Sequence, residues 1–516
     1  CVITKSKIMK AKNYNLFSCF SEQLERCPNK QLIITEDGKS FNFNDINTES
    51  ARIASYLARV GVKPGDRISV QVEKSPESLF LYLACLRAGF IYHPLNPEYK
   101  TTELVFFLND AEPTIMICDD RNLKKIKSLR LKTQSIKSFL TLNGDGSGTL
   151  IEQSKSAEKI YKTFHTPKDH LAALLYSSGT TGTPKGIMLS HMNLISNAKT
   201  LTQSWHFSKK DVLLHALPIF HVHGLFVAIG CALLSAASMN WINKFNAKKI
   251  VQLLPQSTVF MGVPTYYTRL LSEPDFSKAM CSSMRVFISG SAPLLEETFR
   301  TFKNRTGHSI LERYGMTETN MNTSNPIEGE RKPGTVGPPL PGVNLRVVDQ
   351  KNTILGINRI GNLQVKGSNV FMGYWKMPDK TAIDFTKDGF FNTGDKAKIG
   401  EDGYISIVGR SKDMIITGGL NVYPKEIETI IDQIEYVNES AVIGVPHNDF
   451  GEAVVVIVVL SQPNSIDEKT IISYAKEKLA NFKIPKKVIF VEKLPRNTMG
   501  KVQKNVLREM HESLFS

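Results

Sequence analysis

A loop rich in glycine and hydroxyl side chains occupies Tyr176 to Gly186, which reads YSSGTTGTPKG. It directly follows the apolar run 171–175, so we expect a buried strand to lead into it. Glycine lets backbone N–H groups point inward at an anion, and Lys185 adds a positive charge. The spacing matches neither a Walker loop nor a dinucleotide-binding fingerprint. The composition therefore predicts a loop that binds a polyphosphate.

Three later segments repeat the plan of an apolar strand that ends in a loop or helix start. Residues 258–269 (TVFMGVPTYYTR) place a helix that starts at proline after the strand. In residues 285–294 (RVFISGSAPL), the turn has so little bulk that a flat base could lie against its backbone. In residues 311–319 (LERYGMTET), Tyr314 offers a stacking surface and Glu318 offers a hard oxygen ligand for Mg²⁺.

Two histidines, His221 and His223, lie two residues apart in the segment LPIFHVHG (217–224). On a strand they would share one face, so metal binding is one interpretation. A third ligand is not apparent, and structural zinc sites have four. The interpretation that we favour is an aromatic and histidine wall that lines a pocket.

The C-terminal part of the sequence adds a carboxylate and several cations. From Gly361 the composition turns β-rich up to Asp395, whose carboxylate could accept two ribose hydroxyls. Arg410 follows as a second nucleotide contact. The last hundred residues or so are predicted to form a small α+β domain, in which Val454–Leu460 is apolar enough to be buried on both faces. Near its end stands Lys501, in the string RNTMGKVQK.

In order, spacing and chemistry these segments resemble the adenylate-forming superfamily, which includes acyl-CoA synthetases, adenylation domains of peptide synthetases and luciferases. The resemblance implies an α/β fold. A large N-terminal domain (1–411), made of α/β layers and a β-rich subdomain, would bind ATP and the acyl group. A small, mobile α+β domain (412–516) would carry the adenylation lysine, with the hinge at Lys412.

The resemblance also implies a reaction and a set of residues. A carboxylate would attack the α-phosphate of ATP, and the thiol of coenzyme A would displace AMP from the resulting acyl-adenylate. Catalytic roles are implied for Lys501, Thr181, Glu318 and His221. Mg²⁺ would be bound by Glu318 and Thr181. Contacts to ATP or coenzyme A are implied for Ser178, Gly179, Thr180, Thr181, Gly182, Lys185, Ser291, Ala292, Tyr314, Thr317, Asp395, Arg410, Lys412, Gly418 and Gly419.

The identity of the acid is suggested by Arg269 and Arg313, which lie on the expected pocket elements. Two guanidinium groups near an acyl site are costly when left unpaired. A second substrate carboxylate is a natural bidentate partner, which predicts a short dicarboxylate. The alternative is that either arginine pairs with a protein acid such as Glu312.

A narrower resemblance, to malonyl-CoA synthetases, runs from about Leu16 to the C-terminus. It is carried by 220–227 (FHVHGLFV), 261–271 (MGVPTYYTRLL), 289–295 (SGSAPLL), 312–326 (ERYGMTETNMNTSNP), 417–428 (TGGLNVYPKEIE) and 494–508 (LPRNTMGKVQKNVLR). In that family, arginines matching Arg269 and Arg313 hold the far carboxylate of malonate. A serine of the Ser-Gly-Ser turn, here Ser289, assists, and His221 borders the acyl site. The implied substrates are malonate, ATP and coenzyme A.

The elements that must position these residues follow an α/β pattern. We expect a helix, a hairpin and a second helix up to residue 60, then a strand at 66–72, a helix at 78–87 and a strand at 114–118. The polar segment 140–163 is predicted to be a loop. The apolar run 224–241 is interrupted by small and polar residues, so we expect a buried helix rather than a membrane span.

Composition limits the remaining alternatives. The chain has 516 residues and a net charge of +15, but its lysines are spread along the sequence and no nucleic-acid-binding motif is present. The seven scattered cysteines favour a reducing compartment, the cytoplasm or, as an alternative, the mitochondrial matrix. We expect a monomer or weak homodimer. Rival functions are another acyl-CoA synthetase for short, medium-chain or aromatic acids, an adenylation domain that loads a carrier protein, and an inactive ATP-binding regulator.

Overall fold

The computed structural model describes residues 13–132, 134–177, 184–417, 420–447, 450–479, 481–497 and 500–515. The described chain divides into two compact units. Unit 1 comprises the described residues of Cys1–Ser177, Pro184–Phe245 and Ser368–Pro378, and unit 2 those of Asn246–Gly367 and Asp379–Ser516. The domain boundary expected at Lys412 falls inside unit 2 and stays a prediction.

One sheet of unit 1 is mostly parallel, and helices connect its successive parallel strands β3, β4, β5 and β6 along the chain. In order across the sheet, the strands are β17 (Gly373–Tyr374), β8 (Lys185–Ser190), β7 (Leu171–Ser177), β4 (Ile91–Pro94), β3 (Arg67–Gln71), β5 (Ile115–Cys118) and β6 (Ser138–Thr141). The helices that follow β3, β4 and β5 are α3 (Pro76–Ala88), α4 (Thr101–Ala111) and α5 (Asp120–Lys127). Parallel neighbours need such crossovers, so the predicted α/β units are confirmed here.

A second group of parallel strands in unit 1 pairs β9 (Val212–His215) with β10 (Ser238–Trp241) and β10 with β1 (Gln31–Thr35). The edge strand β2 (Ser40–Asn42) forms the predicted hairpin with β1. The helices of this part are α1 (Leu16–Arg26), α2 (Phe43–Arg59), α6 (Thr149–Ser154), α7 (His191–Ser204), the π-helical turn η1 (His223–Ala228) and α8 (Ile229–Ser235).

The opening helix α1 shows how local sequence places an element. The Asn15 side chain accepts from the N–H of Phe17 at 2.9 Å and donates to the carbonyl of Leu86 at 2.8 Å. It therefore caps α1 and ties it to α3 at once. The apolar residues of α1 recur at helical spacing and are buried: Leu16, Phe17, Phe20 and Leu24.

Two expectations for unit 1 are wrong in detail. The segment 140–163 is not only loop, because it contains the end of β6 and the helix α6. The run 224–241 is buried as expected but is not one helix: most of η1, α8 and β10 share it, with Ala236 in a left-handed conformation at the end of α8. The helical part therefore ends at Ala236, and the chain turns there into β10. No helix in the described part of the chain is long and apolar enough to cross a membrane.

Unit 2 begins with parallel strands that carry much of the predicted site. β11 (Val259–Gly262) pairs with β12 (Val286–Ser289), and β12 pairs with β13 (Leu311–Met316). β14 (Asn320–Ser324) returns antiparallel to β13. The intervening helices are α9 (Ala247–Leu253), η2 (Leu254–Gln256), α10 (Pro264–Leu271) and α11 (Glu296–Thr306). The three strand-to-loop junctions predicted from the sequence are present, and the structure makes them neighbours at one sheet edge.

An antiparallel sheet follows, as the β-rich composition predicts. Its order is β15 (Val343–Val348), β16 (Gly361–Gly367), β18 (Phe391–Ile399) and β19 (Ile405–Arg410). The short helix α12 (Pro378–Asp384) precedes β18 in the chain. The side chain of Tyr314 packs against the apolar cluster of this sheet, which connects β13 to β18 and β19.

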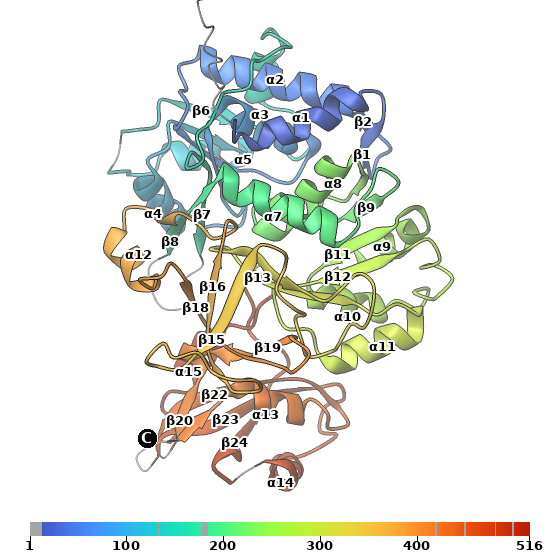
Figure 1. Ribbon diagram of the computed structural model, residues 1–516, viewed down its shortest axis with the longest axis vertical. Coiled ribbons are helices and arrows are strands. Elements are labelled where there is room, and N and C mark those ends of the chain that lie inside the picture. The colour runs from blue at the N-terminus through green and yellow to red at the C-terminus, as the bar shows by residue number, and fades with distance from the viewer. Residues whose placement is uncertain are drawn as a thin grey trace, which may run out of the picture. The chain divides into compact units, whose positions relative to one another are not determined.

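The last part of unit 2 is a sheet with helices on both faces (Figure 1). The strands β21 (Leu420–Val422), β20 (Ile415–Thr417), β23 (Gly451–Leu460) and β22 (Val437–His447) lie in this order, and β24 (Lys487–Phe490) pairs with β23. The helical segments are η3 (Ser411–Asp413), α13 (Pro424–Ile431), α14 (Glu468–Lys478), η4 (Asn481–Lys483) and α15 (Lys504–Met510).

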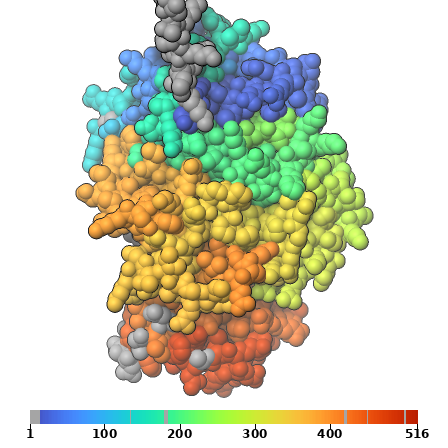
Figure 2. Space-filling view, viewed as in Figure 1, coloured from blue at the N-terminus to red at the C-terminus, as the bar shows by residue number. Residues whose placement is uncertain are grey.

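Alternate residues of β23 belong to two different cores. Val454, Val456 and Val458 pack with α13 and α14, whereas Val455 and Ile457 pack with Leu507 of α15. Successive strand residues point to opposite faces, so an uninterrupted apolar strand fits a sheet covered on both sides. The prediction that this strand is buried on both faces is confirmed. Figure 2 shows the C-terminal residues, in red, as one continuous body.

Candidate active site

A carboxylate, a phenol and a guanidinium meet beside the middle of β18, where β19 ends. The register of β18 and β19 places Asp395 opposite Arg410, and Arg410 Nε lies 3.4 Å from Asp395 Oδ1. The Tyr314 hydroxyl donates to Asp395 Oδ2 at 2.5 Å. Each carboxylate oxygen has two lone pairs, so Asp395 retains capacity for ligand hydroxyls. Three residues predicted to contact the nucleotide therefore lie together, although they come from separate strands.

Lys501 lies next to this group, on a tight turn. The Asn497 side chain accepts from the Lys501 N–H at 3.0 Å, and the Asn497 N–H donates to the Lys501 carbonyl at 2.9 Å. Gly500 has φ +73°, which favours glycine, and a Cβ there would lie 3.2 Å from Thr265 Oγ1 at the start of α10. These contacts therefore fix the backbone of Lys501. Its side chain lies close enough to Asp395 and Arg410 for their charges to act on it.

The electrostatics of this corner favour an anion. Burial, the positive charge of Arg410 and that of Lys412 lower the pKa of Lys501 to about 8. Burial and Arg410 likewise lower the pKa of Lys412 to about 8. Asp395 and Asp413 act in the opposite direction but do not balance the cations. Cations held close together in a partly desolvated site bind phosphate groups strongly.

Arg313 on β13 is the buried cation of the predicted acyl end. Its side chain is 3% exposed, and its Nε and Nη2 atoms lack a hydrogen-bond partner among the described residues. The hydroxyl of Ser289, on the neighbouring strand β12, is also buried without a partner there. Leaving a buried charged donor unsatisfied costs about 1–3 kcal/mol or more. This arrangement is suited to a ligand that brings its own carboxylate.

Glu312 does not neutralise Arg313. No ion pair joins the two side chains; Glu312 Oε1 instead accepts from the N–H of Leu294 at 3.1 Å. Burial raises the pKa of Glu312 to about 7, against the effects of the Leu294 hydrogen bond, Lys425 and Arg313. The alternative that Arg313 serves only as the partner of Glu312 therefore loses its support.

Arg269 lies in a different environment. It is exposed on α10, next to Tyr266, and forms no ion pair with any described residue. Its charge is thus free of protein carboxylates, as a substrate contact requires. A joint role for Arg269 and Arg313 stays a prediction.

Unit 1 holds Lys185 at the end of the predicted phosphate loop. β8 begins at Lys185, opposite Ser177 of β7, so the two strands fix both ends of the loop. Lys185 Nζ lies 4.9 Å from the centre of the Tyr374 ring. The loop residues Ser178, Gly179, Thr180, Thr181 and Gly182 lie outside the described residues, as do Gly418 and Gly419.

His221 lies on a bend before η1 and not on a strand. The two histidines therefore do not share a strand face, and the metal interpretation loses its premise. Within the described chain, no cluster of three or more His, Cys, Asp or Glu side chains could hold a metal. Burial lowers the pKa of His221 to about 4, so the ring is neutral at physiological pH. Its Nε2 is buried and has no described partner.

Other predicted residues lie around the ends of β12 and β13. Ser291 has φ +73°, an uncommon conformation for a residue with a side chain, and Ala292 follows it in the same bend. Thr317 and Glu318 form the turn between β13 and β14, and Glu318 is 9% exposed. Glu318 supplies the type of oxygen that Mg²⁺ prefers.

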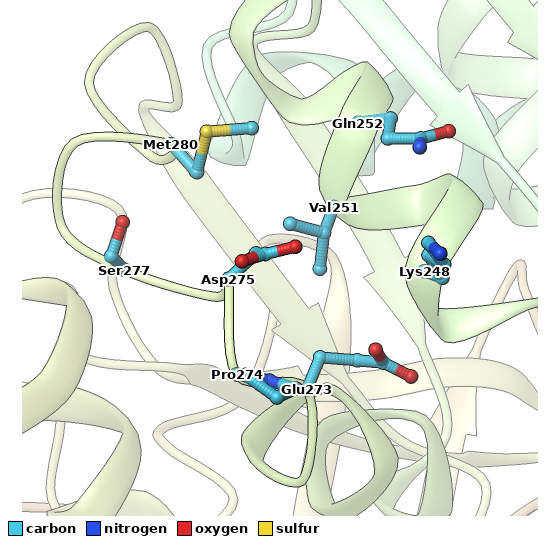
Figure 3. A pocket seen from close by; sticks show the side chains of 8 residues that line it. All are labelled: Lys248, Val251, Gln252, Glu273, Pro274, Asp275, Ser277 and Met280. Atoms are coloured by element: carbon cyan, nitrogen blue, oxygen red, sulfur yellow. The ribbon is translucent and has the colours of Figure 1, made fainter.

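A pocket of about 500 Å³ lies elsewhere in unit 2, between α9 and the chain that follows α10 (Figure 3). It is lined by Lys248, Val251, Gln252, Glu273, Pro274, Asp275, Ser277 and Met280. None of these residues is a predicted site residue. Its two acidic side chains outnumber its single lysine, so this pocket does not suit a polyanion.

Sequence reasoning missed several residues of the site. Asp413 pairs with Arg508 at 2.6 Å and flanks Lys412. Tyr267 lies beside Arg313 and donates from its hydroxyl to the Ile288 carbonyl at 2.6 Å. Gly290 packs against the Arg313 side chain. These contacts join distant segments, and no local pattern in the sequence signals them.

Comparison with known proteins finds family models that match both the N-terminal and the C-terminal parts of the chain. A family model described as AMP-binding enzyme matches residues 20–375, and one described as AMP-binding enzyme C-terminal domain matches 426–501. The mitochondrial malonate–CoA ligase of Homo sapiens is 37% identical, with 94% of this chain and 90% of that protein covered. The long-chain-fatty-acid–CoA ligase of Bacillus subtilis is 32% identical, with coverage of 96% and 94%. Among solved structures, ATP-bound MatB from Rhodopseudomonas palustris is 50% identical, with a TM-score of 0.96 and coverage of 98% and 100%.

Proposed function

Because this chain belongs to the AMP-binding enzyme family, we propose that it joins malonate to coenzyme A through a malonyl-adenylate, with release of pyrophosphate and AMP. It has the adenylate-forming enzyme fold that its sequence predicts. The observation that carries the choice of acid is Arg313, a buried guanidinium that forms no ion pair with any described carboxylate. A dicarboxylate would neutralise this charge with one carboxylate and react through the other. The malonate–CoA ligases among its relatives support the same acid.

In the first step, one malonate carboxylate attacks the α-phosphorus of ATP and pyrophosphate leaves. The reaction brings two anions together, so stabilisation of charge and in-line positioning supply most of the catalysis. Lys501 would bridge the attacking carboxylate and the α-phosphate. Asp395 and Arg410 would hold the ribose side of the nucleotide, and Tyr314 would face the base. Lys185 and the loop that precedes it would hold the outer phosphates.

Mg²⁺ would fit beside the phosphates, with Glu318 and the hydroxyl of Thr181 as its protein ligands. A carboxylate and a hydroxyl, completed by phosphate oxygens and water, match the preference of this ion. When bound, it would neutralise charge on the phosphates during the displacement.

In the second step, the thiolate of coenzyme A attacks the acyl carbon and AMP leaves with the former carboxylate oxygen. We propose that residues 412–516 rotate about Lys412 between the steps, so that Lys501 leaves the pocket and Gly418-Gly419 enters it. Support comes from the position of Lys412, which lies between β19 and the first strand of the C-terminal sheet. Such motions let one pocket serve two reactions in turn.

The rival substrate class is a fatty acid, because a long-chain-fatty-acid–CoA ligase is among the relatives. A panel of malonate, methylmalonate, succinate, propionate, octanoate and benzoate, each with and without coenzyme A, separates the alternatives. We expect malonate to give the highest kcat/KM. We also expect the release of AMP to depend on coenzyme A, with malonyl-CoA as the product. A preference for octanoate or benzoate would reject malonate. ATP–pyrophosphate exchange with no acyl-CoA formed in the presence of coenzyme A would indicate a carrier-loading enzyme instead. No turnover at all would indicate an inactive ATP-binding protein.

Arg269 provides a first test of how the acid is bound. Arg269→Ala removes an exposed guanidinium without breaking an ion pair to any described residue. If this charge holds the distal carboxylate, the KM for malonate should rise about tenfold to a hundredfold, as expected for loss of an ionic hydrogen bond. The KM for propionate, which lacks that carboxylate, should not change. An equal rise for both acids would exclude the role.

The pKa of Lys501 predicts a pH dependence. Its pKa is about 8, below the ordinary value, so its positive charge is lost as pH rises through 8. In ATP–pyrophosphate exchange with malonate but without coenzyme A, the rate should fall above that pH. Lys501→Arg stays charged, so its residual rate should remain level from pH 7 to 9. The same decline in both proteins would assign the titration to another group.

Compartment and assembly are further proposals. The described cysteines form no disulfide, which supports a reducing compartment such as the cytoplasm. We also propose a monomer or weak homodimer, which sedimentation of the full chain at several concentrations would test.

A further inference from the structure

The guanidinium of Arg313 rests on a glycine of the neighbouring strand end. Strands β12 and β13 are parallel, with Ser289 opposite Glu312, so Gly290 follows β12 beside Arg313. An ideal Cβ at Gly290 would lie 2.3 Å from Arg313 Cζ, 2.5 Å from Nε and 2.6 Å from Nη1. Contacts this short do not occur for real side chains, so the observed position of Arg313 requires the bare backbone.

Space, and not backbone conformation, is the reason for glycine at this position. Gly290 is not among the residues with positive φ, whereas its neighbour Ser291 is, at +73°. An alanine at 290 could therefore adopt the same backbone but would push the guanidinium away. Gly356, another glycine of unit 2 without positive φ, lacks this constraint, because an added Cβ there would meet nothing within 4 Å.

The other groups around Arg313 would not resist displacement of its guanidinium by a side chain at position 290. Its Nε and Nη2 have no partner among the described residues, so no protein hydrogen bond at these atoms holds the guanidinium in place. Tyr267 lies beside it, but the Tyr267 hydroxyl is engaged by the carbonyl of Ile288. The unpartnered hydroxyl of Ser289 belongs to the same turn as Gly290. Packing against Gly290 is thus the contact that sets where this charge lies.

We propose that Gly290 is a specificity-determining position: its missing side chain seats Arg313 where the guanidinium, together with Ser289, binds the distal carboxylate of a dicarboxylic acid. The proposal rests on the proposed function, because it assumes that malonate is the acid. Gly290 is a positioning residue in this account, since it acts through Arg313. A side chain at this position would weaken selection for the second carboxylate and leave the chemistry at the first one intact.

The test compares Gly290→Ala with the matched control Gly356→Ala, which adds the same methyl group in open space. Steady-state kinetics are measured with malonate, propionate and ATP. For Gly290→Ala we expect the KM for malonate to rise about tenfold to a hundredfold, with kcat and the KM values for propionate and ATP near those of the unmodified enzyme. Gly356→Ala should match the unmodified enzyme throughout. A malonate KM unchanged in Gly290→Ala, or an equal loss for propionate, would overturn the proposal.

A second pair of variants applies even if Gly290→Ala folds poorly. Lysine lacks the planar group that meets the added methyl, so Arg313→Lys should tolerate alanine at 290. The double variant Gly290→Ala/Arg313→Lys should have the malonate KM of Arg313→Lys alone. A further rise of the size expected for Gly290→Ala would show that Gly290 acts independently of Arg313, and would overturn the proposal. Failure of the unmodified enzyme to use malonate would reject the proposed function itself; normal use of malonate combined with these negative results would reject only the role of Gly290.

Discussion

Lys501→Ala is expected to lower the rate of malonyl-adenylate formation about 10²- to 10³-fold, the usual loss when one preorganised donor to a developing negative charge is removed. The reason is geometric. The Asn497 hydrogen bonds fix the Lys501 backbone, and the side chain approaches Asp395 and Arg410, which are expected to hold the nucleotide. Its partial desolvation strengthens the attraction to phosphate and carboxylate oxygens. ATP–pyrophosphate exchange with malonate measures this step alone.

The same variant should still convert chemically prepared malonyl-adenylate and coenzyme A to malonyl-CoA at a rate near that of the unmodified enzyme. In the second step the proposed motion removes Lys501 from the pocket, so its charge is no longer needed. Lys493→Ala, which removes an exposed lysine from the same C-terminal segment, serves as the control and should leave both steps unchanged. An equal loss of both steps in Lys501→Ala would contradict the assigned role, because it would indicate a general defect of folding or nucleotide binding.

Arg313→Met is expected to lower kcat/KM for malonate on the order of 10²- to 10³-fold, since truncation of a buried charged partner typically costs about 2–5 kcal/mol. Methionine retains much of the volume of arginine but cannot donate a hydrogen bond. The substrate's distal carboxylate would then be buried against an apolar group. Propionate, which has no such carboxylate, should react at least as well as with the unmodified enzyme.

Stability helps to interpret this variant. Arg313 is buried without a described ionic partner, so its removal should leave the melting temperature unchanged or raise it. Arg300→Met, on the exposed side of α11, is a matched control that should leave kcat/KM unchanged for both malonate and propionate. A loss of activity with propionate as large as that with malonate would place Arg313 in general catalysis and remove the main argument for a dicarboxylate.

Much of the candidate nucleotide site is predictable from the sequence because local patterns bring its residues together. Asp395 and Arg410 lie on consecutive antiparallel strands, so the strand register brings them together as soon as the hairpin forms. The junctions after β11, β12 and β13 were predictable for a similar reason: parallel strands joined by helices expose their carboxyl ends at one edge. The predicted catalytic role of Lys501 followed only from the family resemblance, since one lysine in a C-terminal loop has no distinguishing spacing.

Other features depend on contacts that no local pattern encodes. The strand on which the metal interpretation of His221 and His223 depends does not form, because the chain bends at His221 and enters the π-helical turn η1. Apolar residues flank this segment on both sides, so periodicity alone does not distinguish the two conformations. The seat of Arg313 on Gly290 depends on the absence of a side chain in a neighbouring strand end. The ion pair of Asp413 with Arg508 joins residues far apart in the sequence.

Transfer of oxygen from the acid to AMP is the decisive test of the proposed malonyl-adenylate. The enzyme is supplied with malonate labelled with ¹⁸O in both carboxylates, together with ATP and coenzyme A, and the products are analysed by mass spectrometry. Attack of a malonate carboxylate on the α-phosphorus, followed by cleavage of the acyl C–O bond, leaves one ¹⁸O atom in AMP. We predict one labelled oxygen in each AMP, with malonyl-CoA as the other labelled product. Unlabelled AMP, or label in pyrophosphate or inorganic phosphate, would contradict the account.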